Sequence, residues 1–576
     1  MSNPAADSME TGAMLKAAVK CHQDGKLSEA DRSYSAILEE EPDHADAWHL
    51  KGLIAYQSGR FEDAARLIQR AIAVNPGSPE FHNSLGAVQE ALGDTVSSIR
   101  SYVKAIENRP DYSDAYIKLA RLRPDVAEIR FNLACILHRQ GNNGSAIEHY
   151  EAAVRLQPEN VIALNNLGLT LQEMGKIREA GHCYIRAVNL SPDFSEARYN
   201  LGRMYQLQGD LENAIEEYRR AIRTARGSSS RIFYNWALAL QELGQYDEAI
   251  QRYADAVHVD PGYAEARVNR SLLLLLTGRC REAWPEYEWR QRRPDWLSAN
   301  PVYPDLPPWD GSPLPGKRIL VQAEQGFGDT IQFVRYLSLV KNRCGRVILE
   351  APPVLHPLLK SLSAMDEMVA PAPQNTQKAD AGVHLLSLPG IFQTTVETIP
   401  MAVPYLHAPA GKTGKWHSRI SGNGFNIGVV WSGNPAHPEN SMRSCDPGHF
   451  VSLLSLPSVN LYSLQKGPAA DRLRETPGGA GIVDLGPELH DFSDTAAVIM
   501  NLDLVISVDT ALVHLAGALG KPVWTLRYHQ PYWVWGTTGE TSAWYPSMRI
   551  FRQHRPGDWE TVFRRVHHQL KEDVLS

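Results

Sequence analysis

The stretch DLVISVDTALVHLAGALGKPVW (503–524) decides the fold of the second half of the chain. It predicts a buried strand at 504–508, an Ala- and Leu-rich helix at 511–519 and a second strand at 522–526. Strand, helix and strand in this order are typical of a parallel sheet, because parallel neighbours need a crossover connection. We therefore expect an α/β domain here.

The turn between the first of these strands and the helix holds Asp509 and Thr510. It brings backbone N–H groups and the positive end of a helix dipole to the carboxyl edge of the sheet, where anionic ligands bind. Two interpretations are open: the turn binds the phosphate of a ligand, or Asp509 only caps the helix. His514, one helical turn beyond Thr510, either contacts the same ligand or is simply packed.

Bulk properties limit the class of protein. A chain of 576 residues is too long for a single core, and its net charge of −7 disfavours a nucleic-acid binder. The six cysteines contain no CxxC pair, so neither a metal site nor a disulfide framework is indicated. The sequence has neither a secretory signal pattern nor an apolar run of membrane-spanning length. We expect a cytoplasmic protein without a transmembrane segment.

Glycines recur about every 34 residues through the first half, with one longer interval. They are Gly25, Gly59, Gly93, Gly141, Gly175, Gly209, Gly244 and Gly278. Between them a small residue is usually followed four positions later by a tyrosine, as at Ala180 and Tyr184. Small residues let two helices approach closely, and glycine turns the hairpin. This pattern resembles tetratricopeptide (TPR) repeats, and we expect an α superhelix of about eight repeats over residues 11–295.

The repeat is irregular at residues 111–126. The segment DYSDAYIKLARLRP (111–124) looks like a repeat that kept its first helix and lost its second. We expect either a local change in superhelix pitch or one longer helix.

An asparagine ladder occupies one phase of the first helix in five repeats. Its members are Asn132, Asn166, Asn200, Asn235 and Asn269. A side-chain amide both donates and accepts hydrogen bonds, so such a row can hold an extended peptide backbone without selecting its sequence. The TPR arrays of O-linked N-acetylglucosamine transferases carry a similar ladder for acceptor proteins. Asparagine is also common at this position in TPR repeats generally, so a structural role is the alternative.

From residue 317 short β-rich runs alternate with helical stretches. We expect a Pro-rich linker at 296–316, an N-terminal α/β domain at 317–410 and a C-terminal α/β domain at 425–576. A second linker is expected at 409–424. Further predictions are strands at 318–325, 346–352, 383–389, 425–435, 460–463 and 481–485, a turn at 326–329, and helices at 330–342 and 552–570.

Several motifs in this half resemble glycosyltransferase family 9, the heptosyltransferase-like enzymes. They are GFGD (326–329), Arg443-Ser444 and VDTALVHLAGAL (508–519). The segments YSLQKG (462–467) and WYPSMRIFRQ (544–553) are also similar to TPR-linked bacterial members of that group. The resemblance covers residues 317–576. It implies a GT-B-like pair of Rossmann-like domains, with the acceptor side at 317–410 and the nucleotide-sugar-binding side at 425–576. It also implies inverting sugar transfer from a nucleotide-sugar co-substrate, with no metal ion and no other cofactor.

By this resemblance Asp329 is the catalytic base that takes the proton of the acceptor hydroxyl. Glu324 is the reserve candidate, and the alternative for Asp329 is a helix-capping role. Asp509 and Thr510 match an Asp-Thr-Gly motif at the donor phosphate, but Ala511 stands in place of the glycine. Its methyl group lies where a phosphate would approach.

Arg443, Lys466 and His514 complete the predicted donor site. Two cations near strand ends can stabilise a departing nucleoside diphosphate without a metal ion. The chain contains no Asp-x-Asp motif, which metal-dependent GT-A transferases use, and neither a P-loop nor GxSxG.

The leading hypothesis is a TPR-armed GT-B glycosyltransferase that modifies a protein held in the TPR groove. One alternative is an envelope saccharide glycosyltransferase whose TPR half docks a partner protein. The other is a non-catalytic TPR scaffold with a degenerate transferase domain.

Overall fold

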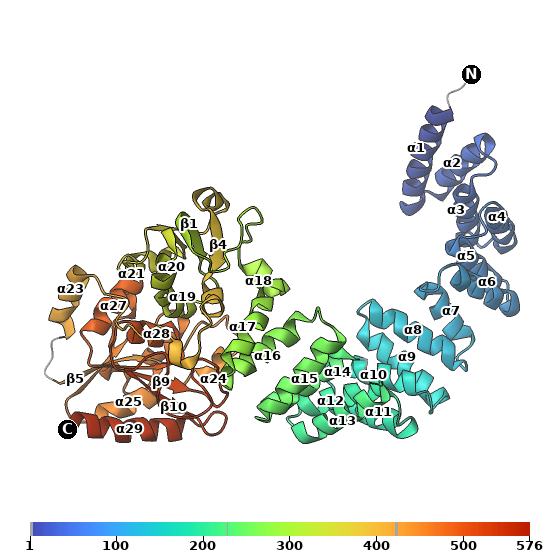
Figure 1. Ribbon diagram of the computed structural model, residues 1–576. Coiled ribbons are helices and arrows are strands. Elements are labelled where there is room, and N and C mark those ends of the chain that lie inside the picture. Colours follow the sequence, from blue (N-terminus) through green and yellow to red (C-terminus); the bar gives the residue numbers. More distant parts are fainter. Residues whose placement is uncertain (1–3, 227–228, 421–423, 576) are drawn as a thin grey trace. The chain divides into compact units, whose positions relative to one another are not determined.

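The computed structural model describes residues 4–226, 229–420 and 424–575 and divides into two compact units, Met1–Ala239 and Leu240–Ser576. Helix hairpins make up the first unit and open the second (Figure 1). The hairpin helices are α1 (Pro4–Gln23), α2 (Leu27–Glu40), α3 (Ala45–Gln57), α4 (Phe61–Val74), α5 (Pro79–Ala91), α6 (Thr95–Asn108), α7 (Ser113–Leu122), α8 (Ala127–Arg139), α9 (Asn143–Leu156), α10 (Val161–Glu173), α11 (Ile177–Leu190), α12 (Ser195–Leu207), α13 (Leu211–Thr224), α14 (Ser230–Glu242), α15 (Tyr246–Val259), α16 (Ala264–Leu276) and α17 (Cys280–Tyr287).

The recurrent glycines turn the hairpins, as predicted. All eight have φ between 74° and 81°, a left-handed conformation that other residues adopt only with strain. The tyrosines of the second helices are buried between hairpin partners. A β-carbon at Gly168 would lie 2.6 Å from Cε1 of Tyr184, so the missing side chain in α10 makes room for the ring from α11. The run of helices is a TPR solenoid.

The irregular interval contains one short helix, α7, between the hairpins α5–α6 and α8–α9. It packs on both α6 and α8, and its buried Leu119 belongs to the same apolar cluster as Tyr102 of α6. The segment therefore kept its first helix and lost its second. The alternative of one longer helix is wrong, because turns separate α7 from both neighbours.

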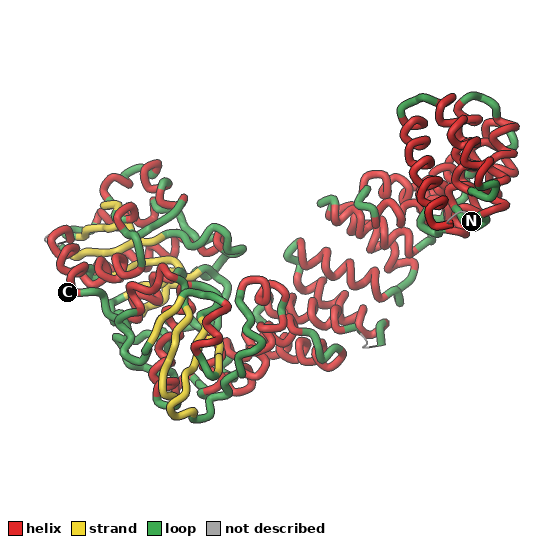
Figure 2. Tube along the Cα trace, turned by 90° about the horizontal axis from the view of Figure 1, so that it is seen from above, coloured by secondary structure: helices red, strands yellow, loops and turns green. Residues whose placement is uncertain are grey.

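Two separate parallel sheets follow the solenoid (yellow in Figure 2). The first has the order β3-β2-β1-β4, from β1 (Leu314–Gln322), β2 (Cys344–Glu350), β3 (Glu367–Val369) and β4 (Ala381–His384). The second has the order β10-β9-β8-β5-β6-β7, from β5 (Phe425–Val430), β6 (Val459–Ser463), β7 (Val483–Asp484), β8 (Leu504–Val508), β9 (Val523–Arg527) and β10 (Met548–Arg552). This α/β region is consistent with a GT-B-like pair.

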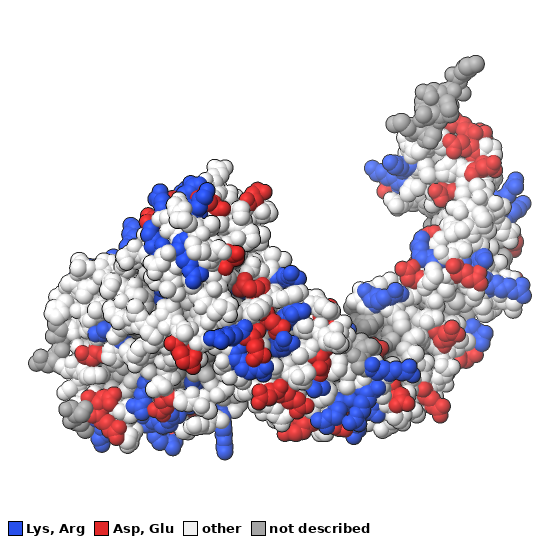
Figure 3. All heavy atoms as spheres, in the orientation of Figure 1, with Lys and Arg blue, Asp and Glu red and all other residues white. Residues whose placement is uncertain are grey.

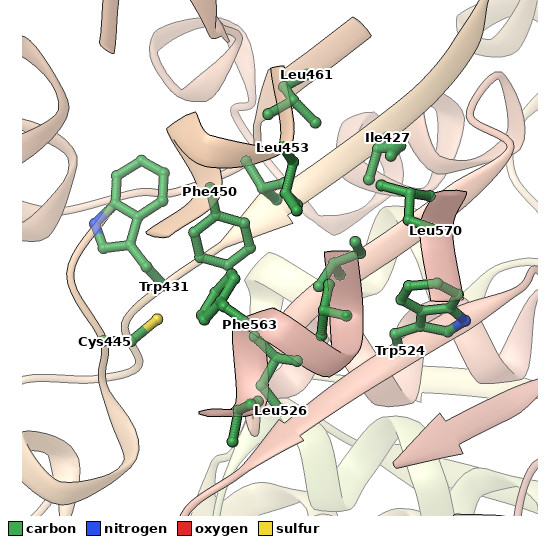
Figure 4. Close-up of a cluster of buried hydrophobic side chains, with 14 of the residues drawn as sticks. Ile427, Trp431, Cys445, Phe450, Leu453, Leu461, Trp524, Leu526, Phe563 and Leu570 are labelled. Carbon is green, nitrogen blue, oxygen red and sulfur yellow. The ribbon is translucent and has the colours of Figure 1, made fainter. Parts of the chain in front are cut away.

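The second sheet has a dense core on one face. Trp431, Phe450 and Phe563 meet there beside aliphatic side chains of β5, β6, β8 and β9 (Figure 4). Strands β8 and β9 are buried along their whole length, which explains their uninterrupted apolar sequence. The core fixes the sheet, and the polar side chains that follow its strands then lie along one edge.

The helices of the α/β region are mostly short. They are α18 (Pro294–Ala299), α19 (Phe327–Phe333), α20 (Leu337–Lys341), α21 (His356–Leu359), α22 (Leu388–Ile391), α23 (Ala410–Ile420), α24 (Asn440–Arg443), α25 (Gly448–Val451), α26 (Arg472–Glu475), α27 (Phe492–Met500), α28 (Ala511–Ala518) and α29 (Trp559–Leu575).

Four sequence predictions need correction. The turn expected at 326–329 is largely the first turn of α19, and the helix expected at 330–342 is interrupted by a 3₁₀ segment at 334–336. The closing helix begins at Trp559 rather than 552, because β10 occupies 548–552 and Gly557 has a left-handed φ of 77°. Within the linker expected at 409–424, α23 forms and packs on α27, with residues 421–423 outside the described ones.

Candidate active site

Helices α19 and α28 follow the central strands of the two sheets and pack against each other (Figure 1). Gly328 makes this contact possible. A β-carbon there would lie 3.0 Å from Cδ2 of His514 and 3.4 Å from Cα of Ala511. Gly328 of the GFGD motif therefore lets the two α/β halves come into close contact.

Asp329 lies in the first turn of α19, and Oδ2 of its carboxylate accepts a hydrogen bond of 3.0 Å from the backbone N–H of Gly326. Asp329 therefore caps α19, as the structural alternative predicted. The pKa of Asp329 is raised to about 6, chiefly by burial and also by the negative charges of Glu324 and Asp509, while the bond from Gly326 opposes the rise. A carboxyl group with this pKa changes protonation state near neutral pH, as a general base must.

Asp509 does not cap α28. Thr510 is the N-cap, and its hydroxyl accepts from the backbone N–H of Leu512 at 3.3 Å. The carboxylate of Asp509 instead pairs with the buried guanidinium of Arg527 and accepts from Nε1 of Trp535 at 3.1 Å. The charge of Asp509 is thereby held by protein groups, and the N–H groups of the turn are what an anionic ligand would meet.

His514 is buried on the α19-facing side of α28. Its Nδ1 lies 3.1 Å from the hydroxyl of Tyr545, and its ring stacks on Trp535 at 5.1 Å between centroids. Burial lowers the pKa of His514 to about 4, so the ring is neutral at physiological pH. These contacts give His514 a packing role, and its contact with a donor stays a prediction.

Arg443 lies at the end of α24, in the loop that follows β5. The amide of Gln465 fixes the start of this loop by accepting from the backbone N–H groups of Trp431 and Ser432 at 3.1 and 2.9 Å. A β-carbon at Gly433 would lie 2.6 Å from Nη2 of Arg443, so the guanidinium rests directly on the loop backbone. The side chain is partly exposed and available to a ligand.

Lys466 follows β6 and is exposed, and its ammonium group donates to the carbonyl oxygen of Leu489. In the sheet β5 lies between β8 and β6, with Val430 opposite Ser507 and Val429 opposite Ser463. The structure therefore brings the segments after β8, β5 and β6 to one carboxyl edge. Asp509, Thr510, Arg443 and Lys466 follow these three strands.

Glu324, the reserve base, is fully buried and committed to other groups. Arg290, from the turn after α17, donates to both of its oxygens at 2.6 and 3.1 Å. Nε1 of Trp296 adds a bond of 2.7 Å. Although burial opposes ionisation, Arg290 holds the pKa of Glu324 below its ordinary value. The prediction of Glu324 as an alternative base is therefore wrong, and its role is to tie the last TPR turn to β1.

Sequence analysis missed the aromatic segment 528–545 that follows β9. Trp533 lies edge-on to Trp284 of α17, with centroids 6.0 Å apart, and within 6.3 Å of Phe333 in α19. Tyr532 is half-buried, and burial and the charges of Asp329 and other groups raise its pKa well above its ordinary value. The density of tyrosine and tryptophan in YHQPYWVW (528–535) was the available signal.

Three members of the asparagine ladder bind the preceding repeat. Asn200 is buried and donates to Oδ1 of Asn165 at 2.9 Å, and Asn235 donates to the hydroxyl of Tyr199 at 3.1 Å. Asn166 donates more weakly to Sγ of Cys135 at 3.8 Å. Asn132, Asn166, Asn235 and Asn269 are partly exposed. Their contact with a peptide stays a prediction, and Asn200 has a structural role.

Acidic and basic side chains are interspersed along the visible helices (Figure 3). Neighbouring pairs include Arg219 with Glu216 and Arg267 with Glu286. Among the helices of the described residues, none is long and apolar enough to cross a membrane.

Comparison with known families finds matches in both halves of the chain. The tetratricopeptide repeat family matches residues 23–65, 49–113, 165–229 and 234–288, and a second TPR family matches 134–175. Glycosyltransferase family 9 (heptosyltransferase) matches residues 459–557. The chain therefore carries TPR repeats and a glycosyltransferase family 9 domain. The family 9 match supports its assignment as a glycosyltransferase.

Among individual proteins, the chain is similar to Protein FlbA of Caulobacter vibrioides, with 27% identity over 60% of this chain and 62% of FlbA. It is also similar to human tetratricopeptide repeat protein 7B, with 31% identity over 14% of this chain and 10% of that protein. The chain thus spans less than two thirds of either relative. The crystal structure of the APC/C hetero-tetramer Cut9-Hcn1 matches with a TM-score of 0.28 and 17% identity, covering 50% of this chain and 54% of that one.

Proposed function

We propose that this protein transfers a sugar, with inversion and without a metal ion, from a nucleotide-sugar donor to a hydroxyl of a protein held by the TPR groove. The observation that carries the proposal is Asp329, whose carboxylate stands at the contact of α19 with α28 and has a pKa near 6. The family 9 match and the cations after β5 and β6 support the donor half of the proposal.

In this mechanism the acceptor oxygen attacks the anomeric carbon of the donor while Asp329 takes its proton. The bond from the anomeric carbon to the diphosphate breaks, and the nucleoside diphosphate leaves with the electron pair. Its charge is stabilised by Arg443, Lys466 and backbone N–H groups at the start of α28. Asp509 positions the turn by binding Arg527 and Trp535.

The acceptor polypeptide would lie along the four partly exposed asparagines, Asn132, Asn166, Asn235 and Asn269. An amide whose N–H already binds the neighbouring repeat still offers its carbonyl oxygen to a peptide N–H. Replacing Asn132 and Asn166 by alanine should weaken binding of an acceptor protein while leaving hydrolysis of the donor unchanged. Equal affinity in the double variant would contradict the ladder's role.

The central experiment is a screen of UDP-, GDP- and ADP-sugars for binding and slow hydrolysis by the full chain, beside Asp329→Asn. Asparagine keeps an oxygen that can accept from Gly326, so the cap survives while the base is lost. Asp558→Asn is the matched control, because Asp558 caps α29 away from the site. Turnover that is lost only in D329N supports the proposal. A chain that binds no donor is instead the non-catalytic scaffold.

The identity of the acceptor needs a separate experiment. A chain lacking residues 1–229 keeps α14 and the whole second unit. If the groove holds the acceptor, this shortened chain should hydrolyse the donor but fail to modify protein. Undiminished protein modification would refute the role of the groove. Transfer to saccharides alone, measured by mass spectrometry, would instead favour the envelope enzyme.

A further inference from the structure

The loop between β1 and α19 contains a strained residue close to the proposed base. Gln325 has a φ of 61°, which is the left-handed conformation. A residue other than glycine keeps this conformation only where its surroundings hold it. The peptide bond after Gln325 carries the N–H of Gly326, which donates to Oδ2 of Asp329 at 3.0 Å. The backbone angles of Gln325 therefore determine whether this N–H reaches the carboxylate.

A side chain of the last TPR hairpin holds Gln325. Its Nε2 donates to the hydroxyl oxygen of Tyr287, in α17, at 3.3 Å. Gln325 is exposed, so burial does not fix its side chain. The bond to Tyr287 is thus the contact that ties this strained residue to the rest of the molecule.

Tyr287 is itself held firmly. Its side chain is only 5% exposed, and Cζ of Arg290 lies 4.6 Å from the centroid of its ring. Arg290 in turn donates to both carboxylate oxygens of Glu324, the residue before Gln325. The end of the last hairpin therefore grips two successive residues of the loop, one through Arg290 and the other through Tyr287.

The hydroxyl of Tyr287 is a neutral anchor and not a second base. Burial raises the pKa of Tyr287, and the charges of Glu324 and Asp329 add to the rise, while Arg290 opposes it. The hydroxyl therefore keeps its proton at neutral pH and does not compete with Asp329 for the proton of an acceptor.

We propose that Tyr287 is a positioning residue for Asp329. Its hydroxyl anchors Gln325 in the left-handed conformation, and this conformation points the N–H of Gly326 at the carboxylate. The inference rests on the proposed function in taking Asp329 as the base. It gives the last TPR hairpin a part in the transferase site that does not depend on an acceptor in the groove.

Tyr287→Phe removes the anchoring hydroxyl and keeps the ring. In the full chain, Y287F should lower kcat for hydrolysis of UDP-N-acetylglucosamine, GDP-mannose or ADP-glucose about 5- to 30-fold, because the left-handed conformation is disfavoured by about that factor for residues other than glycine. KM should not change, because the predicted donor groups follow strands of the second sheet. Gln325→Met removes the amide instead and should have the same effect. The matched control is Tyr336→Phe, because the buried hydroxyl of Tyr336 binds Thr394 and not this loop.

Glycine at position 325 separates positioning from packing. Glycine adopts a φ near 61° without strain, so Gln325→Gly should keep the N–H of Gly326 on Asp329 even without the anchor. Y287F/Q325G should therefore regain most of the turnover that Y287F loses. Gln393 is also exposed and left-handed, with a φ of 49°, so Y287F/Q393G is the matched control and should regain none. Full turnover in Y287F, or no recovery in Y287F/Q325G, overturns the positioning role.

A second measurement needs no turnover. The N–H of Gly326 lowers the pKa of Asp329, so its loss in Y287F should raise that pKa above its value of about 6. Ionised Asp329 destabilises the fold, so in urea unfolding the advantage of Y287F/D329N over Y287F should keep growing above about pH 6. The advantage of D329N over wild type should level off there. If wild type hydrolyses none of the three donors and this difference appears, the proposed function fails and the positioning role stands. Advantages that level off at the same pH overturn the positioning role.

Discussion

Replacing Asp329 by asparagine should separate the chemistry of the site from its stability. The carboxyl group has a pKa of about 6 in the folded protein, against an ordinary value of 3.8. Folding thus favours the protonated carboxyl group, and ionisation of Asp329 lowers the stability of the folded protein. At about 1.4 kcal/mol per pKa unit, the charge destabilises the fold by at most ~3 kcal/mol above pH 6.

The direction of the pKa shift determines the pH range in which stability changes. Below pH 3.8 the group is protonated in both states and costs nothing. Between pH 3.8 and 6 the unfolded chain releases its proton first, so the stability of the native state falls as pH rises. D329N has no proton to release there. Its advantage over wild type should grow across this window and stay constant above it.

The assay is urea unfolding followed by tryptophan fluorescence between pH 4.5 and 8. All tryptophans except Trp48 and Trp236 lie after residue 240, so the signal reports the α/β unit. D329N should be more stable than wild type at pH 8, and turnover should fall about 10²–10⁴-fold. If D329N is less stable than wild type at pH 8, then burial of the charge does not outweigh the capping hydrogen bond, and the argument is refuted. Unchanged turnover would refute the base.

Three further outcomes follow from single contacts. Ala511→Gly should tighten nucleotide-sugar binding, measured by calorimetry, because the methyl group at the donor turn is removed; an unchanged affinity would place the phosphates elsewhere. Arg290→Met should lower the melting temperature of the α/β unit sharply, since it leaves the buried charge of Glu324 unpaired, and the double variant with Glu324→Gln should recover about half of the loss or more; no recovery would contradict the pairing. Gly168→Ala should cost about 1–3 kcal/mol in solenoid unfolding, because the new methyl group meets the ring of Tyr184, and a neutral result would mean that the ring moves aside freely.

Periodic features were predictable from the sequence. The glycine interval and the small-residue-to-tyrosine spacing repeat many times, so chance matches at one position do not matter. The predicted bounds of β8 agree with the observed ones, because a continuous apolar run followed by Asp509 leaves few possible positions for the strand ends. Shorter elements were placed less well: the 3₁₀ interruption at 334–336 leaves no mark in composition.

The sequence predicts on which segments the candidate residues lie, but not which groups those residues contact. Asp329 and Asp509 both follow buried strands, and sequence alone could not show which of the two carboxylates is ion-paired. That distinction depends on Arg527, which lies eighteen positions beyond Asp509 at the end of the neighbouring strand. Likewise the sequence could not show that Arg290 pairs with Glu324, since the pair joins two domains that were expected to be separated by a linker.

The buried pair of Arg290 with Glu324, together with Trp284 against Trp533, limits how this chain can change in evolution. Repeat arrays usually gain and lose whole repeats, because each repeat contacts only its neighbours. Here the final hairpin is also part of the transferase core, so a duplication or deletion at that end would leave a charge unpaired and an aromatic cluster open. The array can vary in length only upstream of α16. A chimera that gives this transferase a different arm should therefore be joined before the last hairpin, not at the Pro-rich segment.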